Sequence, residues 1–361
     1  MLKNLSANWD LDSYFPGGSN SVEFANYLAD LQKQITDFQQ ELAQLETADG
    51  SHDTWKHILN ETQDIAKKLR HASSFTTCLA AQNTQDKKAV QLVGRMNALN
   101  ALNANLMTSI EERLLELSET TFNQLLKDEY FVPLTFNLTE IREKASKKLT
   151  ADKESIINAL SVDGYHAWST LYNSITGSLK IPVEIDGQLK KLSPGQAANM
   201  MSSPDRTIRE KVFTSWETSW GQVADNCALA LNSIAGFRLN VYQQRGWDDF
   251  LYEPLEYNRM TRQTIEAMWT AINKNKEPLV KFLSRKKKLL GIDKMSWHDY
   301  TAPIGASSRT FSLEKGANFV VEHISNFSPT MGKLVTRAFN ENWVESENRD
   351  NKRAGAFCSS S

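Results

Sequence analysis

The apolar residues in the first third of the chain recur at intervals of three and four, and this spacing constrains the fold more than any other feature. The first stripe runs from residue 24 to residue 45 and consists of Phe24, Leu28, Leu31, Ile35, Phe38, Leu42 and Leu45. A helix has 3.6 residues per turn, so these side chains share one of its faces. The sequence therefore predicts a long amphipathic helix in this region.

Two more stripes of the same kind follow a break at Asp49-Gly50-Ser51. They run from Trp55 to Leu79 and from Val90 to Leu117. Long helices with short polar joins pack as antiparallel neighbours. The chain has only nine prolines and 16 glycines, which agrees with a high helix content. We predict a mainly α fold built on long antiparallel helices.

A β-hairpin is predicted near residues 179–192. Leu179 to Ile185 alternates in polarity, Asp186-Gly187 is a typical hairpin turn, and the pattern resumes from Gln188 to Leu192. We place the boundary between two lobes here. Residues 1–185 then form an N-terminal helical lobe, and residues 186–361 form the beginning of a second lobe.

The second lobe is also predicted to be helical. Ser193-Pro194 and Ser203-Pro204-Asp205 are typical helix starts. After the second start, one long helix is expected to carry its apolar residues from Val212 to Val241 along one side. A further helix is expected from Thr264 to Leu290, with five apolar residues pointing inward: Met268, Trp269, Ile272, Phe282 and Leu283.

The overall composition argues against several classes of function. Forty-one basic residues against 43 acidic ones give a net charge of −2, so we expect neither nucleic acid nor a membrane surface as a partner. The three cysteines are far apart, which is typical of a reducing compartment. With no signal peptide or membrane span expected, the sequence predicts a cytoplasmic protein.

No catalytic or metal-binding motif occurs in the sequence. None of the six histidines forms the zinc-binding pattern H-E-x-x-H, and the inverted pattern fails because position 319 is Phe319, not histidine. A lone His323 is more typical of a surface or capping residue than of a metal ligand. No catalytic, cofactor-binding or metal-binding residue can be nominated by motif.

Several segments of the second lobe resemble the oligoendopeptidase F family of zinc metallopeptidases, which are similar to thimet oligopeptidase. The resemblance depends on the order and spacing of several pieces more than on any one of them. They are residues 203–211, 231–238, 257–268, 297–303, and the final run from Phe339 and Trp343 to Lys352–Phe357.

The resemblance implies a helical clamshell whose two lobes enclose a channel for short peptides. In this family the Gly-Ala-Phe segment precedes a helix bearing H-E-x-x-H, and the complete enzyme holds one zinc ion. This sequence ends before that helix. Residues 186–361 are therefore expected to be the first, incomplete part of the catalytic peptidase lobe, and the chain alone is expected to bind no zinc and cleave no peptide.

The final segment provides the only candidate site residues. The candidates for contact with a peptide in the cleft are Lys352, Arg353, Gly355, Ala356 and Phe357. By resemblance they lie in a strand region where exposed backbone would pair with an extended peptide. The structural alternative is that Gly355 allows a close approach of backbone and Phe357 fills a core.

Two further hypotheses remain open. The chain is either a complete non-catalytic helical protein that binds peptides or a partner, or it works with a second polypeptide that supplies the missing C-terminal catalytic part. If catalytic helices are absent, the apolar stripes between Ser193 and Phe339 should be partly exposed, and the isolated chain should self-associate.

Overall fold

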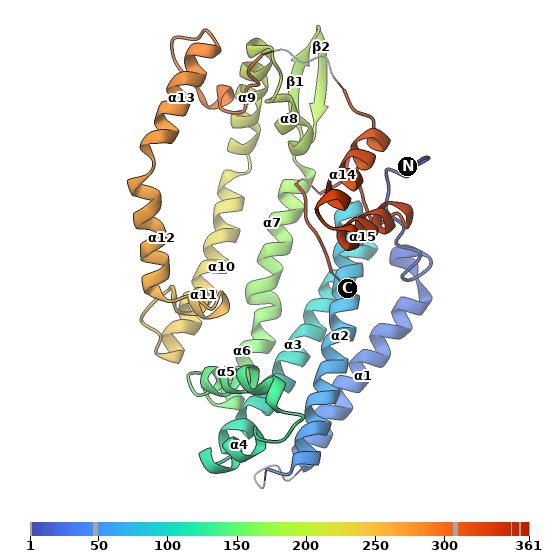
Figure 1. Cartoon of the computed structure of the whole chain (residues 1–361), viewed down its shortest axis with the longest axis vertical. Coiled ribbons are helices and arrows are strands. Elements are labelled where there is room, and N and C mark those ends of the chain that lie inside the picture. The colour runs from blue at the N-terminus through green and yellow to red at the C-terminus, as the bar shows by residue number, and fades with distance from the viewer. Residues whose placement is uncertain (1, 46–49, 306–309, 348, 354, 361) are drawn as a thin grey trace. The chain divides into compact units, whose positions relative to one another are not determined.

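The computed structural model describes residues 2–45, 50–305, 310–347, 349–353 and 355–360. It divides into two compact units. Figure 1 labels the helices and strands of both. The bundle unit contains Leu11–Ser174, Ala228–Asp248 and Ala356–Ser361. The hairpin unit contains Met1–Asp10, Ile175–Cys227 and Asp249–Gly355. The prediction of a mainly α fold with one small hairpin is confirmed.

Three long helices form the core of the bundle unit. They are α1 (Val22–Gln44), α2 (His52–Gln82) and α3 (Lys87–Glu116). The stripe predicted for the first helix is buried from Phe24 to Leu42, and it belongs to the same hydrophobic cluster as the fully buried Trp55 of α2. The Ser21 hydroxyl accepts a hydrogen bond from the Phe24 amide and so caps the start of α1.

Shorter helices complete the bundle unit: α4 (Glu119–Leu125), α5 (Thr135–Ala145), α6 (Ala151–Ser161) and most of α7 (Ala167–Ser178). A π-helical turn (Val162–His166) joins α6 to α7. Gly164 in this turn lies against the Phe237 ring, where an added Cβ would come within 3.1 Å of the ring. The glycine therefore permits the close approach of α10 (Ala224–Arg245).

An ion pair joins α6 to the end of α10. The buried Glu154 carboxylate accepts two hydrogen bonds from Arg245, at 2.9 and 2.6 Å, and a third from the Leu149 amide at 3.0 Å. The Trp247 ring lies 4.7 Å from the Arg245 guanidinium carbon and donates its indole N–H to the Lys147 carbonyl. This pair fixes the last turn of α10 within the bundle unit.

The hairpin unit is built on β1 (Ile181–Ile185) and β2 (Gln188–Leu192), which pair antiparallel. Asp186 and Gly187 form the turn and both have positive φ, 53° and 72°. The predicted hairpin is thus confirmed. Alternate β1 residues are buried against α8 (Pro194–Met200) and α9 (Arg206–Gly221), in a cluster that includes Val212.

The predicted long helix from residue 206 to residue 241 is wrong in one respect, because the structure has two helices there. The first helix, α9, ends at Gly221, and α10 begins at Ala224. Glycine has the lowest helix propensity after proline, which favours the break at this position. Residues of α10 from Ala228 onwards belong to the bundle unit and not to the hairpin unit.

The rest of the hairpin unit is helical. After α11 (Tyr252–Tyr257) come α12 (Arg262–Lys274) and α13 (Glu277–Leu289), then a 3-10 turn (Trp297–Asp299), α14 (Leu313–Phe327) and α15 (Pro329–Asn340). The helix expected from Thr264 to Leu290 is therefore interrupted, with Pro278 in the first turn of α13.

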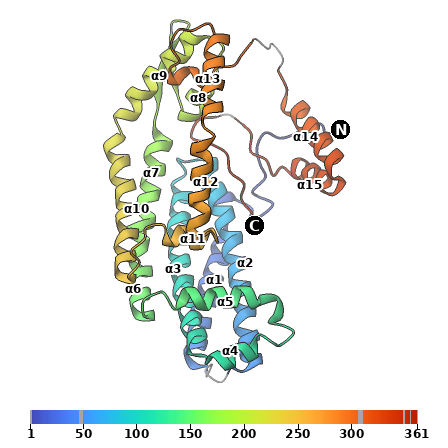
Figure 2. The same ribbon diagram turned by 60° about the vertical axis from the view of Figure 1, so that its left-hand side comes forward.

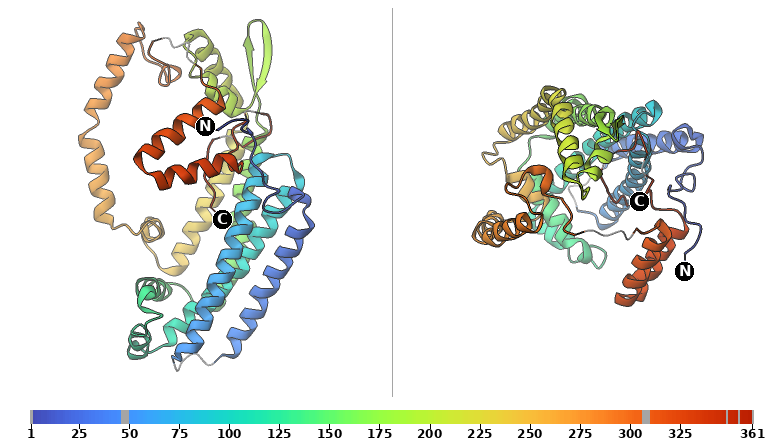
Figure 3. Two further views of the ribbon diagram at one scale, coloured as in Figure 1. Left: turned by 45° about the vertical axis from the view of Figure 1, so that its right-hand side comes forward. Right: turned by 90° about the horizontal axis from the view of Figure 1, so that it is seen from above.

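The N-terminal segment of the hairpin unit is bound to its C-terminal part. The Asp10 amide donates to the Asn342 carbonyl at 2.8 Å, and the Ser346 amide donates to the Ala7 carbonyl at 2.7 Å. Leu2 exchanges two backbone hydrogen bonds with the Asn318 side chain of α14. Figure 3 shows α14 and α15 side by side with this segment next to them. In the part of the chain that is described, no helix is long and apolar enough to cross a membrane.

Candidate functional site

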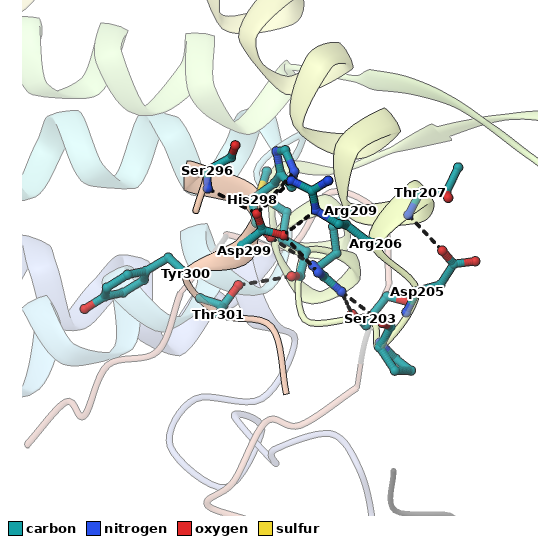
Figure 4. A network of polar contacts seen from close by, with 12 residues as sticks. Ser203, Asp205, Arg206, Thr207, Arg209, Ser296, His298, Asp299, Tyr300 and Thr301 are labelled. Atoms are coloured by element: carbon teal, nitrogen blue, oxygen red, sulfur yellow. Dashed lines mark hydrogen bonds and ion pairs between the residues drawn. The ribbon is translucent and has the colours of Figure 1, made fainter. Parts of the chain in front are cut away.

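A network of charged groups, in which Arg209 and Asp299 are buried and Arg206 is exposed, links the start of α9 to the 3-10 turn at residues 297–299 (Figure 4). Arg206 donates two hydrogen bonds to the Asp299 carboxylate, at 3.0 and 3.1 Å. Arg209 donates to the same carboxylate at 3.0 Å and to the carbonyls of His298 and Ser203 at 2.9 and 2.7 Å. Asp299 is fully buried and Arg209 is only 2% exposed.

The electrostatics of this network keep Asp299 ionised. Burial by itself disfavours the charged carboxylate, but the hydrogen bonds from Arg206, Arg209 and the Ser296 amide hold the pKa of Asp299 well below its usual range. Each carboxylate oxygen accepts two hydrogen bonds. A carboxylate this fully engaged cannot act as a general base, so the network fixes the position of α9 and is not a catalytic centre.

Two further bonds join the same segments. The Thr301 hydroxyl donates to the Met201 carbonyl at 3.0 Å, and the Lys286 ammonium of α13 donates to the Tyr300 carbonyl at 2.5 Å. Lys286 is the buried member of the basic run from Arg285 to Lys288, because its side chain reaches back to the 297–301 segment.

A cavity of about 770 Å³ lies beside the network, within the hairpin unit. Apolar side chains from α9, α13 and the 294–300 segment make up much of its lining, and Glu210, Lys287 and Lys294 add charge. The apolar lining residues are Phe213, Val280, Leu283, Met295 and Trp297. His298 also lines the cavity, but its buried Nε2 lies 3.7 Å from the Asp299 carboxylate and has no hydrogen-bond partner.

The histidines do not provide a zinc site. His52 lies 3.1 Å from Asp128, His57 lies 2.7 Å from Glu41, and His323 stacks on the Phe319 ring. Zinc in proteins requires at least three convergent His, Cys, Asp or Glu ligands. Among the described residues no such group of three exists. The side chains in the described ranges therefore do not fit the zinc ion implied by the resemblance.

The five candidate residues for peptide contact fall in both units. Lys352, Arg353 and Gly355 belong to the hairpin unit, whereas Ala356 and Phe357 belong to the bundle unit. Residues 352, 353 and 355–360 form neither helix nor strand. Their role in peptide contact stays a prediction.

Two of the candidates have defined surroundings. The Lys352 ammonium donates to the Glu347 carbonyl at 2.8 Å and lies 3.5 Å from the Glu345 carboxylate, so it is engaged within its own segment. Gly355 has a φ of 90°, and an added Cβ would meet no atom within 4 Å. The backbone conformation, and not crowding in this chain, explains the glycine.

Sequence reasoning did not find the Arg209–Asp299 network. Both partners lie in segments that were identified by resemblance, residues 203–211 and 297–303. The sequence offers only one indication of this contact, which is that two such segments about 90 residues apart carry opposite charges. Opposite charges predict an ion pair only if the fold is already known to bring the two segments together.

The relatives that the sequence comparisons find are named as oligopeptidases or oligoendopeptidases. A family model described as oligopeptidase F matches residues 113–181. The group B oligopeptidase PepB of Streptococcus agalactiae is 21% identical over 324 residues, which cover 83% of this chain and 52% of PepB. An oligoendopeptidase F homolog of Lactococcus lactis is 20% identical over 335 residues, covering 90% of this chain and 56% of the relative.

The fold is similar to solved structures of the same name. The crystal structure of oligoendopeptidase-F from Enterococcus faecium superposes with a TM-score of 0.72 at 16% identity, covering 89% of this chain and 66% of that one. Together, the matches in sequence and fold support the resemblance to the oligoendopeptidase F family. The chain spans about half the length of the curated relatives it matches.

Proposed function

We propose that this chain is part of a zinc-dependent metalloendopeptidase that hydrolyses short oligopeptides in the cytoplasm, and that the chain alone is inactive. The observation that carries the proposal is the match to oligopeptidases over 83–97% of this chain but only 52–58% of their length. Relatives with a peptidase name support a peptidase, and the uncovered length leaves room for the catalytic residues.

The arrangement of the described residues supports the second half of the proposal. Asp299 is saturated by hydrogen bonds, and no histidine belongs to a group of three potential metal ligands in the described ranges. We therefore expect the one zinc ion to be held by residues other than the described ones. The part of the chain that would face a peptide is the segment containing Lys352 and Phe357, whose described residues form neither helix nor strand.

Metal analysis and peptide cleavage test the proposal directly. The purified chain is incubated with zinc, dialysed, and analysed for metal per chain by mass spectrometry, and it is then assayed with a mixture of peptides of 5–20 residues. We expect well below one zinc per chain and no cleavage. One tightly held zinc per chain, or cleavage that a chelator stops, would refute it.

The second candidate function is a non-catalytic helical protein that binds peptides or a partner. It is favoured by the hydrogen bonds between the N-terminal segment and residues 342–347, which tie down the C-terminal part of the hairpin unit. This candidate requires one cooperative unfolding transition and protection of residues 290–361 from proteases. Rapid proteolytic trimming of that region would exclude it and favour the first proposal.

A further inference from the structure

His298 lines the cavity beside the Arg209–Asp299 network and carries a buried nitrogen that is not hydrogen-bonded. The residue is 7% exposed, and its Nε2 has no hydrogen-bond partner among the described residues. The Asp299 carboxylate lies 3.7 Å from Nε2, which is too long for a hydrogen bond, and each of its oxygens already accepts two. A buried polar atom without a partner is destabilising unless a water molecule or a ligand bonds to it. His298 therefore indicates that a polar group enters the cavity.

The cavity wall that contains His298 is held on two sides. The His298 carbonyl accepts a hydrogen bond from Arg209 of α9 at 2.9 Å, and the Tyr300 carbonyl accepts one from Lys286 of α13 at 2.5 Å. Figure 2 shows α9 and α13 at the same end of the hairpin unit. Residues 298–300 are thus bonded to both helices, so the cavity exists before any ligand binds, which is typical of ligand sites.

The two helices contribute one row of side chains each to the cavity. The lining positions recur at three, four and seven along each helix, so each set shares a helix face: 210, 213 and 214 on α9, and 280, 283, 284 and 287 on α13. Phe213 and Leu283 are half-buried, and so is Met295 in the segment that follows α13. These side chains give the cavity an apolar interior.

The same cavity accounts for Leu283, one of five residues that were expected to point inward from α12 and α13. Leu283 is half-buried, but the other four are exposed: Met268, Trp269, Ile272 and Phe282. Their predicted inward orientation is wrong, because periodicity identifies an apolar face without showing what covers it. The partial exposure expected for the apolar stripes between Ser193 and Phe339 is found on these two helices.

The charged lining residues differ in depth. Lys287 is half-buried, whereas Glu210 and Lys294 are exposed and carry opposite charges. An ammonium group has three N–H donors, and Lys287 uses one of them on the Asp293 carbonyl at 3.0 Å. Two donors of Lys287 therefore remain for a ligand. Together with the unpaired nitrogen of His298, they favour an anionic group inside the cavity.

We propose that this cavity binds a small apolar molecule that carries one carboxylate. The apolar body lies among Phe213, Leu283 and Met295. The carboxylate accepts hydrogen bonds from the Lys287 ammonium and from the His298 imidazole in its Nε2–H form. A cation would be repelled by Lys287, and a wholly apolar molecule would leave Nε2 unpaired. The cavity volume of about 770 Å³ lies in the range of ligand sites, roughly 300–1,000 Å³.

Calorimetric titration of the full chain tests the proposal. The probes are 3-phenylpropanoate and its uncharged counterpart 3-phenylpropanamide, which share one apolar body. We expect saturable binding of the carboxylate and binding of the amide that is weaker by about tenfold or more, because charge-assisted hydrogen bonds are lost. Absence of saturable carboxylate binding, or equal affinities for the two probes, would overturn the proposal.

Two substitutions on α13 locate the carboxylate. Lys287→Met keeps the aliphatic stem and removes the ammonium, so it should weaken binding of 3-phenylpropanoate by about tenfold and leave binding of the amide unchanged. Lys288→Met is the matched control, because Lys288 is exposed on the same helix and does not line the cavity. Equal carboxylate affinities for the two variants would contradict the role of Lys287.

Replacing His298 separates a ligand contact from a structural role. His298→Phe keeps a ring of similar size and removes Nε2, so it should weaken carboxylate binding by about tenfold. The melting temperature should not fall, because Nε2 makes no hydrogen bond to the described residues in the free chain. A lower melting temperature with unchanged carboxylate affinity would assign His298 a structural role and overturn its part in the site.

Methyl NMR shows where the probe binds. In a chain labelled with [13C-methyl]methionine, the signals of Met295 and Met96 are assigned by their loss in Met295→Leu and Met96→Leu. We expect the Met295 signal to move when 3-phenylpropanoate is added. Met96 is buried in the core of the bundle unit, so its signal should stay in place. Saturable binding with an unmoved Met295 signal would place the probe elsewhere and overturn the proposal.

A carboxylate on an apolar group occurs in free acids and at the C-terminus of a peptide. Competition between 3-phenylpropanoate and the tripeptide Gly-Gly-Phe distinguishes the two sources. Tighter binding of the tripeptide would identify a peptide C-terminus as the occupant, and tighter binding of the acid would identify a free acid; either result supports the site. None of these measurements uses zinc content or peptide cleavage, so the carboxylate site and the proposed function can fail independently.

Discussion

Replacing Asp299 with asparagine removes the negative charge that pairs with the buried Arg209 guanidinium. Each Asp299 oxygen accepts two hydrogen bonds, so an amide nitrogen at either position would face two donors. Removing one partner of a buried ion pair costs about 3–5 kcal/mol. We expect Asp299→Asn to lower the free energy of unfolding by about this amount, because the guanidinium of Arg209 is buried and cannot become solvated instead.

Urea unfolding and amide hydrogen exchange measure the effect. For a unit of this size a loss of 3–5 kcal/mol corresponds to a fall in melting temperature of about 10 °C. Exchange should accelerate in residues 206–221 and 296–301, which the network joins, and stay unchanged in α1–α3 of the bundle unit. This local pattern distinguishes the network from a general loss of stability.

Asp205→Asn is the matched control. Asp205 is exposed and caps α9 through the Thr207 amide at 2.8 Å, and asparagine caps helices equally well. We expect Asp205→Asn to lower the free energy of unfolding by less than about 0.5 kcal/mol. A loss below about 1 kcal/mol for Asp299→Asn, or equal losses for both variants, would refute the argument that the buried ion pair holds α9 in place.

The same residue predicts a dependence on pH. The folded-state pKa of Asp299 is lowered below its value in the unfolded chain, so its contribution is fully present above pH of about 4 and is lost as pH falls further. The difference in unfolding free energy between the wild type and Asp299→Asn should be constant from pH 5 to pH 8 and should narrow below pH 4. A difference that grows on acidification would contradict the sign of this shift.

Three further changes test other parts of the structure. Glu154→Gln should lower the free energy of unfolding in urea by about 3 kcal/mol, because it leaves the Arg245 guanidinium without its counter-charge. Lys153→Gln, at an exposed position, is the control and should leave this free energy almost unchanged. Similar losses in the two variants would contradict a stabilising buried ion pair. Gly187→Ala should lower the free energy of unfolding by about 1 kcal/mol, because the φ of Gly187 is 72° and alanine is strained at this angle. An unchanged free energy of unfolding would contradict this prediction. Burial lowers the pKa of His71, so its contribution is present above pH of about 6.5 and lost on acidification. Unfolding of wild type and His71→Phe at pH 7 and pH 5 should show a larger acid loss in wild type; parallel losses would exclude His71 as the cause.

The sequence by itself determined the elements whose signals are local. The stripe from Phe24 to Leu42 predicted α1 because helical periodicity and burial coincide there. The Asp186-Gly187 turn predicted the hairpin because both positions need positive φ. The capping box at Ser193 and Gln196 likewise fixed the start of α8. Family resemblance was readable too, from segments whose order along the chain is preserved.

Only the tertiary structure decided which distant segments meet. Arg209 and Asp299 are 90 positions apart in the sequence, and Ser346, whose amide donates to the Ala7 carbonyl, is 339 positions from Ala7. No local sequence pattern predicts either contact. Periodicity also predicted α12 without saying what its apolar face contacts. A stripe specifies that a partner is needed, since burying apolar surface is favourable, but the identity and position of the partner depend on the rest of the fold. For this reason the sequence predicted that Trp269 points inward, whereas the structure shows it exposed on α12.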